Sequence, residues 1–507
     1  MNGALASPEL LPLHPKKIAR RSTSTLENMI RFFFGGNALI AVIVLVLITF
    51  FLFREGFGFF GQNLANLRVY RAAGLEYVDI MREQADAHAA LSRAVSDVRV
   101  REVRALARDG KSLDQINARL ASFDKFATEF SDAGTDLAGM VSDLGDFASA
   151  LKEKVTVEGL SVAGEADKLR ASYPQYEQIC AAMAATLSTL LAQAPPLSSA
   201  QAQSAFENVK ARTREFLSAF PAQAAKLRAW DPTKPVPWYR SVTAFLFDKR
   251  WITASFWQDW YGIIPLLAGS VMVSLVALLL AVPFGVASAI YVSEIASPIE
   301  QRVIKPYIEF IAAIPSVVLG FFGIAVVGQA VRAASESSFF SWVPFFPISE
   351  RLNVFTAGSL LALMAVPTIF TLAEDALRNV PRSFKEASYA LGANRLQTIL
   401  RIIVPAALSG IISAILLGLG RVIGETMVVL LCAGNRIAIP DFTQSLGVFF
   451  QPVHTMTGII AQEMGEVVRG SIHYRALFMV GLVLFGLTLL INLAAQKVVA
   501  RYRMSIG

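Results

Sequence analysis

The chain has 507 residues, of which 54% are hydrophobic and only 17% are charged, and its formal net charge is +7. Soluble globular domains carry about 25% charged residues, so the composition excludes a purely soluble enzyme and a disordered regulator. The two cysteines, Cys180 and Cys432, lie far apart in the sequence, which excludes a disulfide framework or a cysteine-based zinc site.

Long apolar segments are the main feature of the sequence. A helix needs about 20 mostly apolar residues to cross a bilayer. Six segments qualify, at residues 32–53, 263–292, 308–331, 354–373, 406–433 and 476–495. A cleaved signal peptide is the alternative for the first segment, but no small-residue cleavage site follows before Arg54 and Glu55. We therefore expect an all-α polytopic membrane protein with six transmembrane helices.

Basic residues near the helix ends predict the orientation of the chain. They are concentrated before the first helix, between the fourth and fifth, and after the sixth: Lys16, Lys17, Arg20, Arg21, Arg31, Arg378, Arg382, Lys385, Arg395, Arg401, Lys497, Arg501 and Arg503. We expect a multi-pass protein of the bacterial inner membrane, with cytoplasmic tails at 1–31 and 497–507.

Residues 54–260 form a polar, Ala-rich insert that this orientation places outside the cytoplasm. Their apolar residues recur in steps of three and four, as in a coiled-coil-like helical bundle. One such run, from Leu113 to Leu151, predicts a helix of about 40 residues, close to 60 Å long. Breaks at Asp109-Gly110, near Gly159 and at Pro195-Pro196 divide the insert into four antiparallel helices, followed by a Pro-rich linker. The bundle is either a packed structural domain or a docking or sensing arm.

The sequence shows no catalytic constellation. Residues 109–112 mimic the end of a phosphate-binding loop, but Ala105 occupies the position where that pattern needs a glycine. The histidines lack metal-ligand spacing, so we expect neither an enzyme nor a cofactor or metal site in this chain. We also expect no nucleic-acid partner, because the surroundings are membrane lipid.

The predicted cytoplasmic loop at about 381–405 has a conspicuous pattern. It reads as a short amphipathic helix, a glycine turn and a second helix that ends at Pro405. Glu386, Ala387 and Ser388 begin the pattern and Gly392 follows, a residue that adopts a left-handed turn at little cost. The loop resembles the EAA loop of ABC-importer permeases, with Ser388 in place of the second alanine. The resemblance implies that these four residues dock on a separate ATPase subunit, which supplies ATP and Mg²⁺ chemistry; a helix resting on the membrane surface is the alternative.

Arg421 and Glu425 lie in the fifth apolar segment, four residues apart, which predicts that they share one helix face. Ionisable groups at membrane depth mark a transport pathway or a buried pair. Arg421 is suited to binding a phosphate oxygen, and Glu425 to holding Arg421 or accepting from a protonated oxyanion. A structural salt bridge is the alternative.

The run containing this pair, GLGRVIGETM, resembles the PstC-type permeases of phosphate ABC importers, as do IPSVVLGFFG at 314–323 and MTGIIAQEMGE at 456–466. The resemblance covers residues 261–496, the expected permease core. It implies transport-critical roles for Arg421 and Glu425, and four kinds of partner: a PstA-type permease subunit, an ATPase dimer, a periplasmic phosphate-binding protein and inorganic phosphate. We further expect Gln462, Glu463 and Glu466 to contact the binding protein, with a solvated loop as the alternative.

The function expected from these features is ATP-driven import of inorganic phosphate by alternating access. Two other functions stay open: import of another oxyanion, such as sulfate or molybdate, and a membrane phosphate sensor with a helical extracytoplasmic domain.

Overall fold

The computed structural model describes residues 20–158, 162–253, 255, 257–340, 342–343 and 345–502. It begins with α1 (Arg20–Ala72), which leads into the insert formed by α2 (Leu75–Arg108), α3 (Leu113–Asp132), α4 (Thr135–Glu153), η1 (Lys154–Glu158), α5 (Ala163–Arg170), α6 (Tyr173–Ala192), α7 (Ala200–Ser218) and α8 (Phe220–Arg228). A junction follows, made of α9 (Tyr239–Phe247) and the antiparallel pair β1 (Trp251–Ile252) and β2 (Trp260–Tyr261).

The remaining elements build the membrane part. They are α10 (Ile264–Ile290), η2 (Tyr291–Ile295), α11 (Pro298–Ala313), α12 (Ser316–Phe322), η3 (Gly323–Val327), α13 (Gly328–Glu336), η4 (Ser338–Phe340), α14 (Val354–Arg378), α15 (Arg382–Ala390), α16 (Arg395–Thr398), η5 (Ile399–Ile403), α17 (Val404–Gly424), α18 (Met427–Cys432), η6 (Phe442–Phe450), α19 (Met456–Glu463) and α20 (Ile472–Tyr502).

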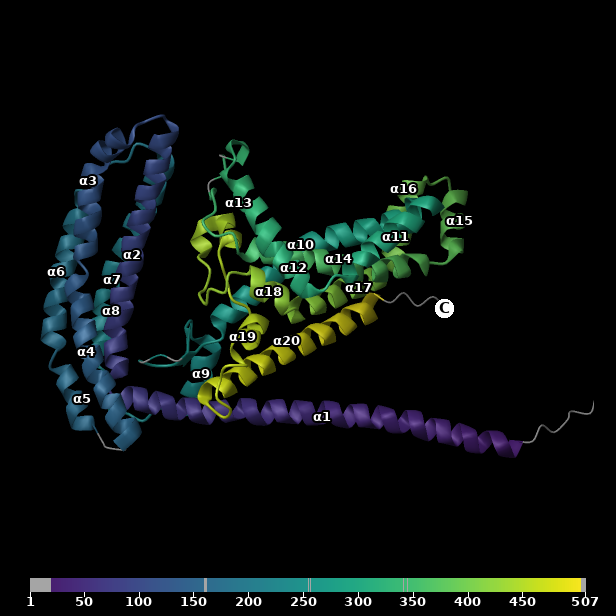
Figure 1. The fold of residues 1–507 in the computed structure, drawn as a ribbon, viewed down its shortest axis with the longest axis horizontal. Coiled ribbons are helices and arrows are strands. Elements are labelled where there is room, and N and C mark those ends of the chain that lie inside the picture. Colours follow the sequence, from purple (N-terminus) through teal and green to yellow (C-terminus); the bar gives the residue numbers. More distant parts are fainter. Residues whose placement is uncertain are drawn as a thin grey trace, which may run out of the picture.

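Six helical segments among the described residues are long and apolar enough to span a membrane, which confirms the predicted fold class. They cover Asn28–Ala72, Ile264–Ile295, Ser316–Glu336, Val354–Arg378, Arg395–Gly424 and Ile472–Lys497. The insert and the α15–α16 hairpin lie at opposite ends of these segments (Figure 1). We call these ends the bundle side and the hairpin side.

Four prolines lie within or beside the predicted membrane helices, and only some of them interrupt a helix. The third predicted segment, 308–331, is divided at Ile314-Pro315, because a residue before proline is driven out of the α region; Ile314 has ψ 124°. Pro283 and Pro367 do not interrupt their helices, since α10 and α14 continue through them. Pro405 does not end a helix either, but lies in the first turn of α17.

The membrane core is centred on α10 and α14, which pack against each other with α17 alongside. Small residues allow this close approach: a Cβ at Gly358 would lie 2.6 Å from Val276 Cγ1, and one at Gly418 would lie 2.7 Å from Ile369 Cγ1. The buried residues of this region are almost all aliphatic, with Cys432 among them. The core therefore holds the end of α17, where the candidate site lies, against α14.

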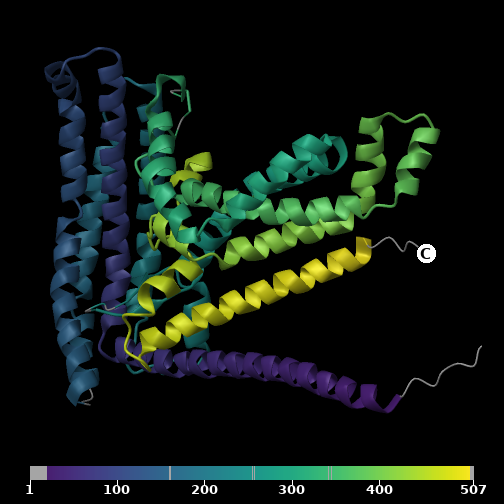
Figure 2. The same cartoon turned by 45° about the vertical axis from the view of Figure 1, so that its right-hand side comes forward.

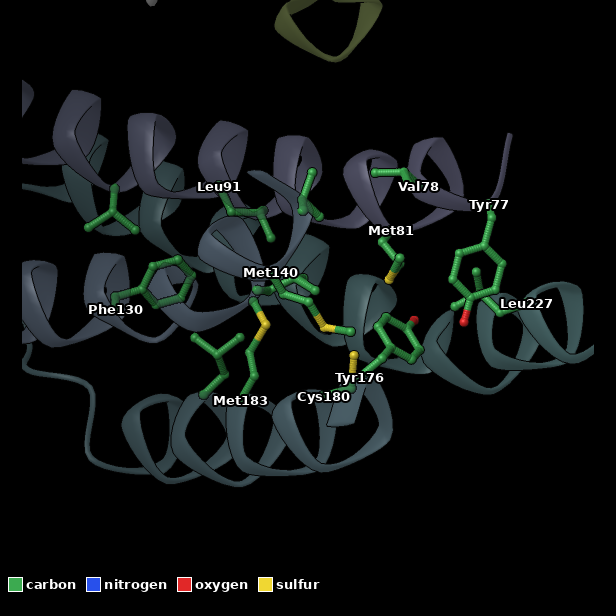
Figure 3. Packing of buried hydrophobic residues seen from close by; sticks show 14 of the residues in the cluster. Tyr77, Val78, Met81, Leu91, Phe130, Met140, Tyr176, Cys180, Met183 and Leu227 are labelled. Carbon is green, nitrogen blue, oxygen red and sulfur yellow. The ribbon is translucent and has the colours of Figure 1, made fainter. Parts of the chain in front are cut away.

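The insert is a bundle of four helical arms: α2, α3 with α4, α5 with α6, and α7 with α8 (Figures 1 and 2). Its interior is a single apolar cluster in which Met140, Met183 and Tyr176 face α2 (Figure 3). The long helix predicted from Leu113 to Leu151 is interrupted at Ala133-Gly134. A contact across the bundle requires glycine at this break, because a Cβ at Gly134 would lie 2.2 Å from His88 Nδ1.

The bundle is carried by α1, whose 53 residues extend about 80 Å, far beyond the roughly 30 Å of a bilayer core. At Gly74, which has φ +79°, the chain turns sharply into α2. The bundle axis consequently runs across the direction of the membrane helices, so the bundle lies over their bundle-side ends (Figure 1).

A clasp formed by the junction and the bundle base fixes this placement. Trp257 Nε1 donates to Asp79 Oδ1 at 2.9 Å, and the Arg82 guanidinium lies 3.6 Å from the centre of the Trp257 ring. Lys152 Nζ donates to the Trp257 carbonyl oxygen at 2.7 Å. These contacts join α2 and α4 to the segment that leads into α10.

Candidate functional site: the end of α17 and the α15–α16 hairpin

Arg421 lies in the last turn of α17, at membrane depth. Its guanidinium is exposed on the chain's surface, and Nη1 donates to the hydroxyl of Thr368 on α14 at 3.2 Å. Gly420 and Gly424 beside it face open space. Because an exposed arginine in hydrocarbon is costly, this face of α17 requires water, an anion or another protein in front of it.

Glu425 does not share a helix face with Arg421, which corrects the expectation from their spacing. α17 ends at Gly424, and Glu425 follows with ψ 135°, an extended conformation. The Glu425 carboxylate accepts from the Met427 backbone N–H at 3.2 Å, at the start of α18. Its backbone carbonyl accepts from Thr457 Oγ1 at 2.8 Å, which ties the break to α19.

No salt bridge joins Arg421 to Glu425 in the part of the chain that the structure describes, so the structural-pair alternative is not supported. The two groups flank a helix break instead. The guanidinium keeps its unused donors available to an anion, while the Glu425 carboxylate accepts from the Met427 backbone N–H. Thr368 is the residue that the sequence analysis missed here, because only packing brings α14 against α17.

The α15–α16 hairpin has the predicted helix–turn–helix form. Gly392 has φ +80° and forms the turn. Ser388 is buried, and its hydroxyl lies 2.9 Å from Thr398 Oγ1, so it holds the two helices of the hairpin together. Glu386 and Ala387 are exposed, and no ion pair is recorded for Glu386 among the described residues.

A cavity of about 520 Å³ opens on the hairpin between Phe384, Ala387, Gly392 and Ile402. Leu391 stands at its edge with 89% of its surface exposed, and Leu396 on α16 is 61% exposed. Exposed leucines beside a hollow are typical of a surface that another protein covers. The signal in the sequence was the leucine directly before the turn glycine.

Glu294 attaches the hairpin to the membrane core, a role that the sequence did not indicate. Its carboxylate lies 2.7 Å from Lys385 Nζ, and its backbone carbonyl accepts from Arg395 Nη2 at 2.5 Å. Both helices of the hairpin therefore contact Glu294, which lies in the last turn of the segment that begins with α10.

The residues expected to contact a binding protein lie at the end of α19, on the bundle side. Gln462 Oε1 is 3.0 Å from His454 Nε2, and Glu463 Oε2 is 2.7 Å from His473 Nε2. These two side chains thus have partners within the chain. Glu466 is exposed in the turn that follows.

Comparisons with known proteins indicate the family of the chain. The family described as "Binding-protein-dependent transport system inner membrane component" matches residues 281–504. "Probable ABC transporter permease protein YqgH" of Bacillus subtilis (strain 168) is 35% identical over 248 residues, covering 48% of this chain and 74% of that protein. "Phosphate transport system permease protein PstC" of Haemophilus influenzae (strain ATCC 51907 / DSM 11121 / KW20 / Rd) is 30% identical over 277 residues, covering 52% of this chain and 83% of that protein.

The chain belongs to this family and is a PstC-type permease. As such it is a non-catalytic, multi-pass subunit of the inner membrane, and the ATPase of an ABC transporter is a separate subunit. A solved structure of the inward-facing methionine ABC transporter MetNI also aligns with 48% of this chain and 94% of that one, at 19% identity and a TM-score of 0.34. The relatives cited above align with about half of the chain, and the family match at residues 281–504 begins after the bundle.

Proposed function

We propose that this permease carries inorganic phosphate across the inner membrane by alternating access. A PstA-type permease subunit completes the pathway, an ATPase dimer drives it, and a periplasmic phosphate-binding protein delivers the ion. ATP and Mg²⁺ belong to the ATPase partner. Both termini of the permease then lie in the cytoplasm, and residues 54–260 form a periplasmic bundle ahead of the core at 261–496.

The exposure of Arg421 carries this proposal. A guanidinium has five donors in a planar fork that matches phosphate oxygens. Within the described part of the chain, Thr368 is the one hydrogen-bond partner of Arg421. The relatives named as phosphate permeases support phosphate as the anion. In this arrangement Arg421 binds the oxyanion, and Glu425 at the adjoining break contacts a protonated phosphate oxygen.

The hairpin supports coupling to an ATPase subunit. Its hollow is lined by Ala387, Ser388 and Gly392, and exposed Leu391 lies beside it. We infer that the ATPase binds here, near exposed Glu386, and that Glu294 passes its movement to α10. On the other side of the membrane, Gln462, Glu463 and Glu466 contact the binding protein, with Glu466 the most available.

Labelled-phosphate uptake tests the proposal. Cells without other phosphate importers would express the chain with its partners as wild type, Arg421→Ala and Arg421→Lys, at matched membrane levels. Arg469→Ala is the control, because Arg469 is exposed in a loop outside the spans. We expect a loss of at least tenfold for Arg421→Ala, a partial loss for Arg421→Lys, which keeps the charge but not the fork, and no loss for the control.

Two outcomes contradict the proposal. Equal uptake by wild type and Arg421→Ala rejects the binding role of Arg421. Absence of phosphate uptake by wild type rejects the substrate, and the same cells then test sulfate and molybdate.

A further inference from the structure

The helix α9 lies where three membrane segments reach the bundle side. Ser241 Oγ donates to the Phe60 carbonyl oxygen of α1 at 2.9 Å, and the Phe245 carbonyl accepts from the Ile263 N–H directly before α10 at 2.8 Å. At nearly the same level, Arg475 near the start of α20 donates to the Gly58 carbonyl oxygen at 3.3 Å. α9 therefore sits at the edge of the membrane part.

This level corresponds to the headgroup layer of a bilayer. The apolar run of α1 ends at Phe53, and exposed Phe57 lies one turn further on. Along the helix, Phe57 is then about 6 Å and Phe60 about 10 Å beyond Phe53. The polar layer of a bilayer is roughly 5–8 Å thick on each side, so α9 is attached at the outer edge of this layer.

The two outer sides of α9 differ in chemistry. Arg240, Thr243, Ala244 and Phe247 line a cavity of about 590 Å³ whose other wall is the bundle base, including Asp79 of α2 and Lys226 of α8. This identifies the side of α9 that faces the bundle. With about 100° per residue, the opposite side presents Trp238, Val242 and Leu246 in steps of four, with Tyr239 beside them.

That opposite side is uncovered and mostly aromatic or aliphatic. Trp238 is 72% exposed, Tyr239 is 55% exposed and Leu246 is 38% exposed. Trp and Tyr are the residues enriched where membrane proteins meet the headgroups, because one end of each ring system is apolar and the other polar. The apolar run of α1 is uncovered within the chain, and Phe57, one turn beyond that run, is 56% exposed, so a lipid-facing helix leads up to the level of α9.

We propose that Trp238, Tyr239, Val242 and Leu246, the α9 stripe, bind phospholipid in the headgroup layer of the bundle-side leaflet. The exposed cation Lys249 lies two residues beyond the end of this helix and is placed to contact lipid phosphates. The stripe anchors the base of the bundle to the membrane surface, in addition to its attachment through α1.

Spin-label accessibility tests this in the assembled transporter in phospholipid nanodiscs. Nitroxides are placed at Leu246→Cys on the stripe, at Thr243→Cys on the cavity side, and at Lys111→Cys in the exposed α2–α3 turn. Both native cysteines are buried, so the unmodified chain serves as the labelling control. We expect the label at 246 to collide at least threefold more with oxygen relative to a water-soluble nickel complex than the label at 111. We expect the label at 243, one turn away, to resemble the label at 111.

Two results overturn the proposal. A label at 246 that is as accessible to nickel as the label at 111 shows that water covers the stripe. A label at 246 that neither collider reaches shows that a partner subunit covers it.

An independent measurement avoids the label. Brominated phospholipid should quench the tryptophan fluorescence of the wild type more than that of Trp238→Phe. Equal fractional quenching in the two proteins would count against contact between Trp238 and lipid.

Discussion

Lys385 and Glu294 form an ion pair between the α15–α16 hairpin and the end of the α10 segment, with Lys385 Nζ 2.7 and 2.9 Å from the two carboxylate oxygens. The carboxylate side chain is only 7% exposed. Partial burial limits solvent screening, so this pair holds its geometry better than a fully exposed one.

Reversal of either charge should uncouple ATP hydrolysis from transport. We expect Glu294→Lys and Lys385→Glu each to lower phosphate moved per ATP hydrolysed several-fold, and the double reversal to restore most of it. Proteoliposomes with the assembled transporter measure both quantities. Glu336→Lys, which breaks the exposed Arg332–Glu336 pair on α13, is the control. Failure of the double reversal to recover coupling would remove the pair from the transmission path.

Loss of the Trp257 side chain should loosen the bundle from the junction. Trp257→Ala removes the hydrogen bond to Asp79 and the ring that stacks against the Arg82 guanidinium. It also removes the ring that packs against Gly145. For this half-buried ring we expect about 2–4 kcal/mol of local destabilisation. Trp257→Phe keeps a ring but no donor, so we expect about 1 kcal/mol. Hydrogen exchange of α2 measures both, and equal protection in the three proteins would contradict the clasp.

Gly74 and Gly110 are two glycines with the same backbone conformation but different surroundings, so together they separate backbone strain from steric overlap. Both have positive φ, +79° and +75°. A Cβ at Gly74 would lie 2.0 Å from Leu169 Cδ1, whereas a Cβ at Gly110 would meet nothing within 4 Å.

We therefore expect Gly110→Ala to cost about 1–2 kcal/mol from the left-handed backbone alone, and Gly74→Ala to cost clearly more. Thermal unfolding of the full chain in detergent, followed by proteolysis of the bundle, compares them. Equal losses would show that Leu169 moves aside without cost.

His88 should make the bundle less stable in mild acid. Burial lowers its pKa from 6.5, although the hydrogen bond of Nε2 with the Phe130 carbonyl acts in the opposite direction. The unfolded chain then binds the proton more readily than the folded one. The stability that neutral His88 contributes is fully present above pH 6.5. It is lost as the pH falls from 6.5 towards the lowered pKa of His88 in the folded chain.

Hydrogen exchange of α2 and α4 between pH 7.5 and 5.5, corrected for intrinsic rates, measures this loss. The variant His88→Gln should show less dependence on pH. An unchanged slope in the variant would assign the acid sensitivity to other groups.

Hydropathy predicted the membrane segments because the cost of exposing polar backbone to lipid leaves helices as the main solution. It did not predict where they break. The break after Gly424 depends on Thr457, which lies 32 positions away in the sequence from Glu425 and bonds its carbonyl. Periodicity likewise predicted the bundle seams, while the need for glycine at position 134 depends on His88 from another arm.

The site residues show the same division. Residue type and spacing identified Arg421 and the turn at Gly392, because an arginine in an apolar run and a glycine after a helix carry local meaning. Thr368 and Glu294 carry no such signal, since their positions depend on how α14 and α10 pack. Residue type and local spacing can be interpreted from the sequence, whereas contacts between distant segments cannot.

The length of α1, together with the clasp at Trp257, makes the bundle a lever. α1 continues from the membrane into the bundle base without a flexible joint other than Gly74, and the clasp braces that turn. From its base at Leu75, α2 extends about 50 Å to Arg108. A tilt of α1 by about 5° in the transport cycle would then displace the far end of the bundle by roughly 4 Å. A small rearrangement inside the membrane would thus be amplified into a movement at the far end of the bundle, remote from the membrane helices.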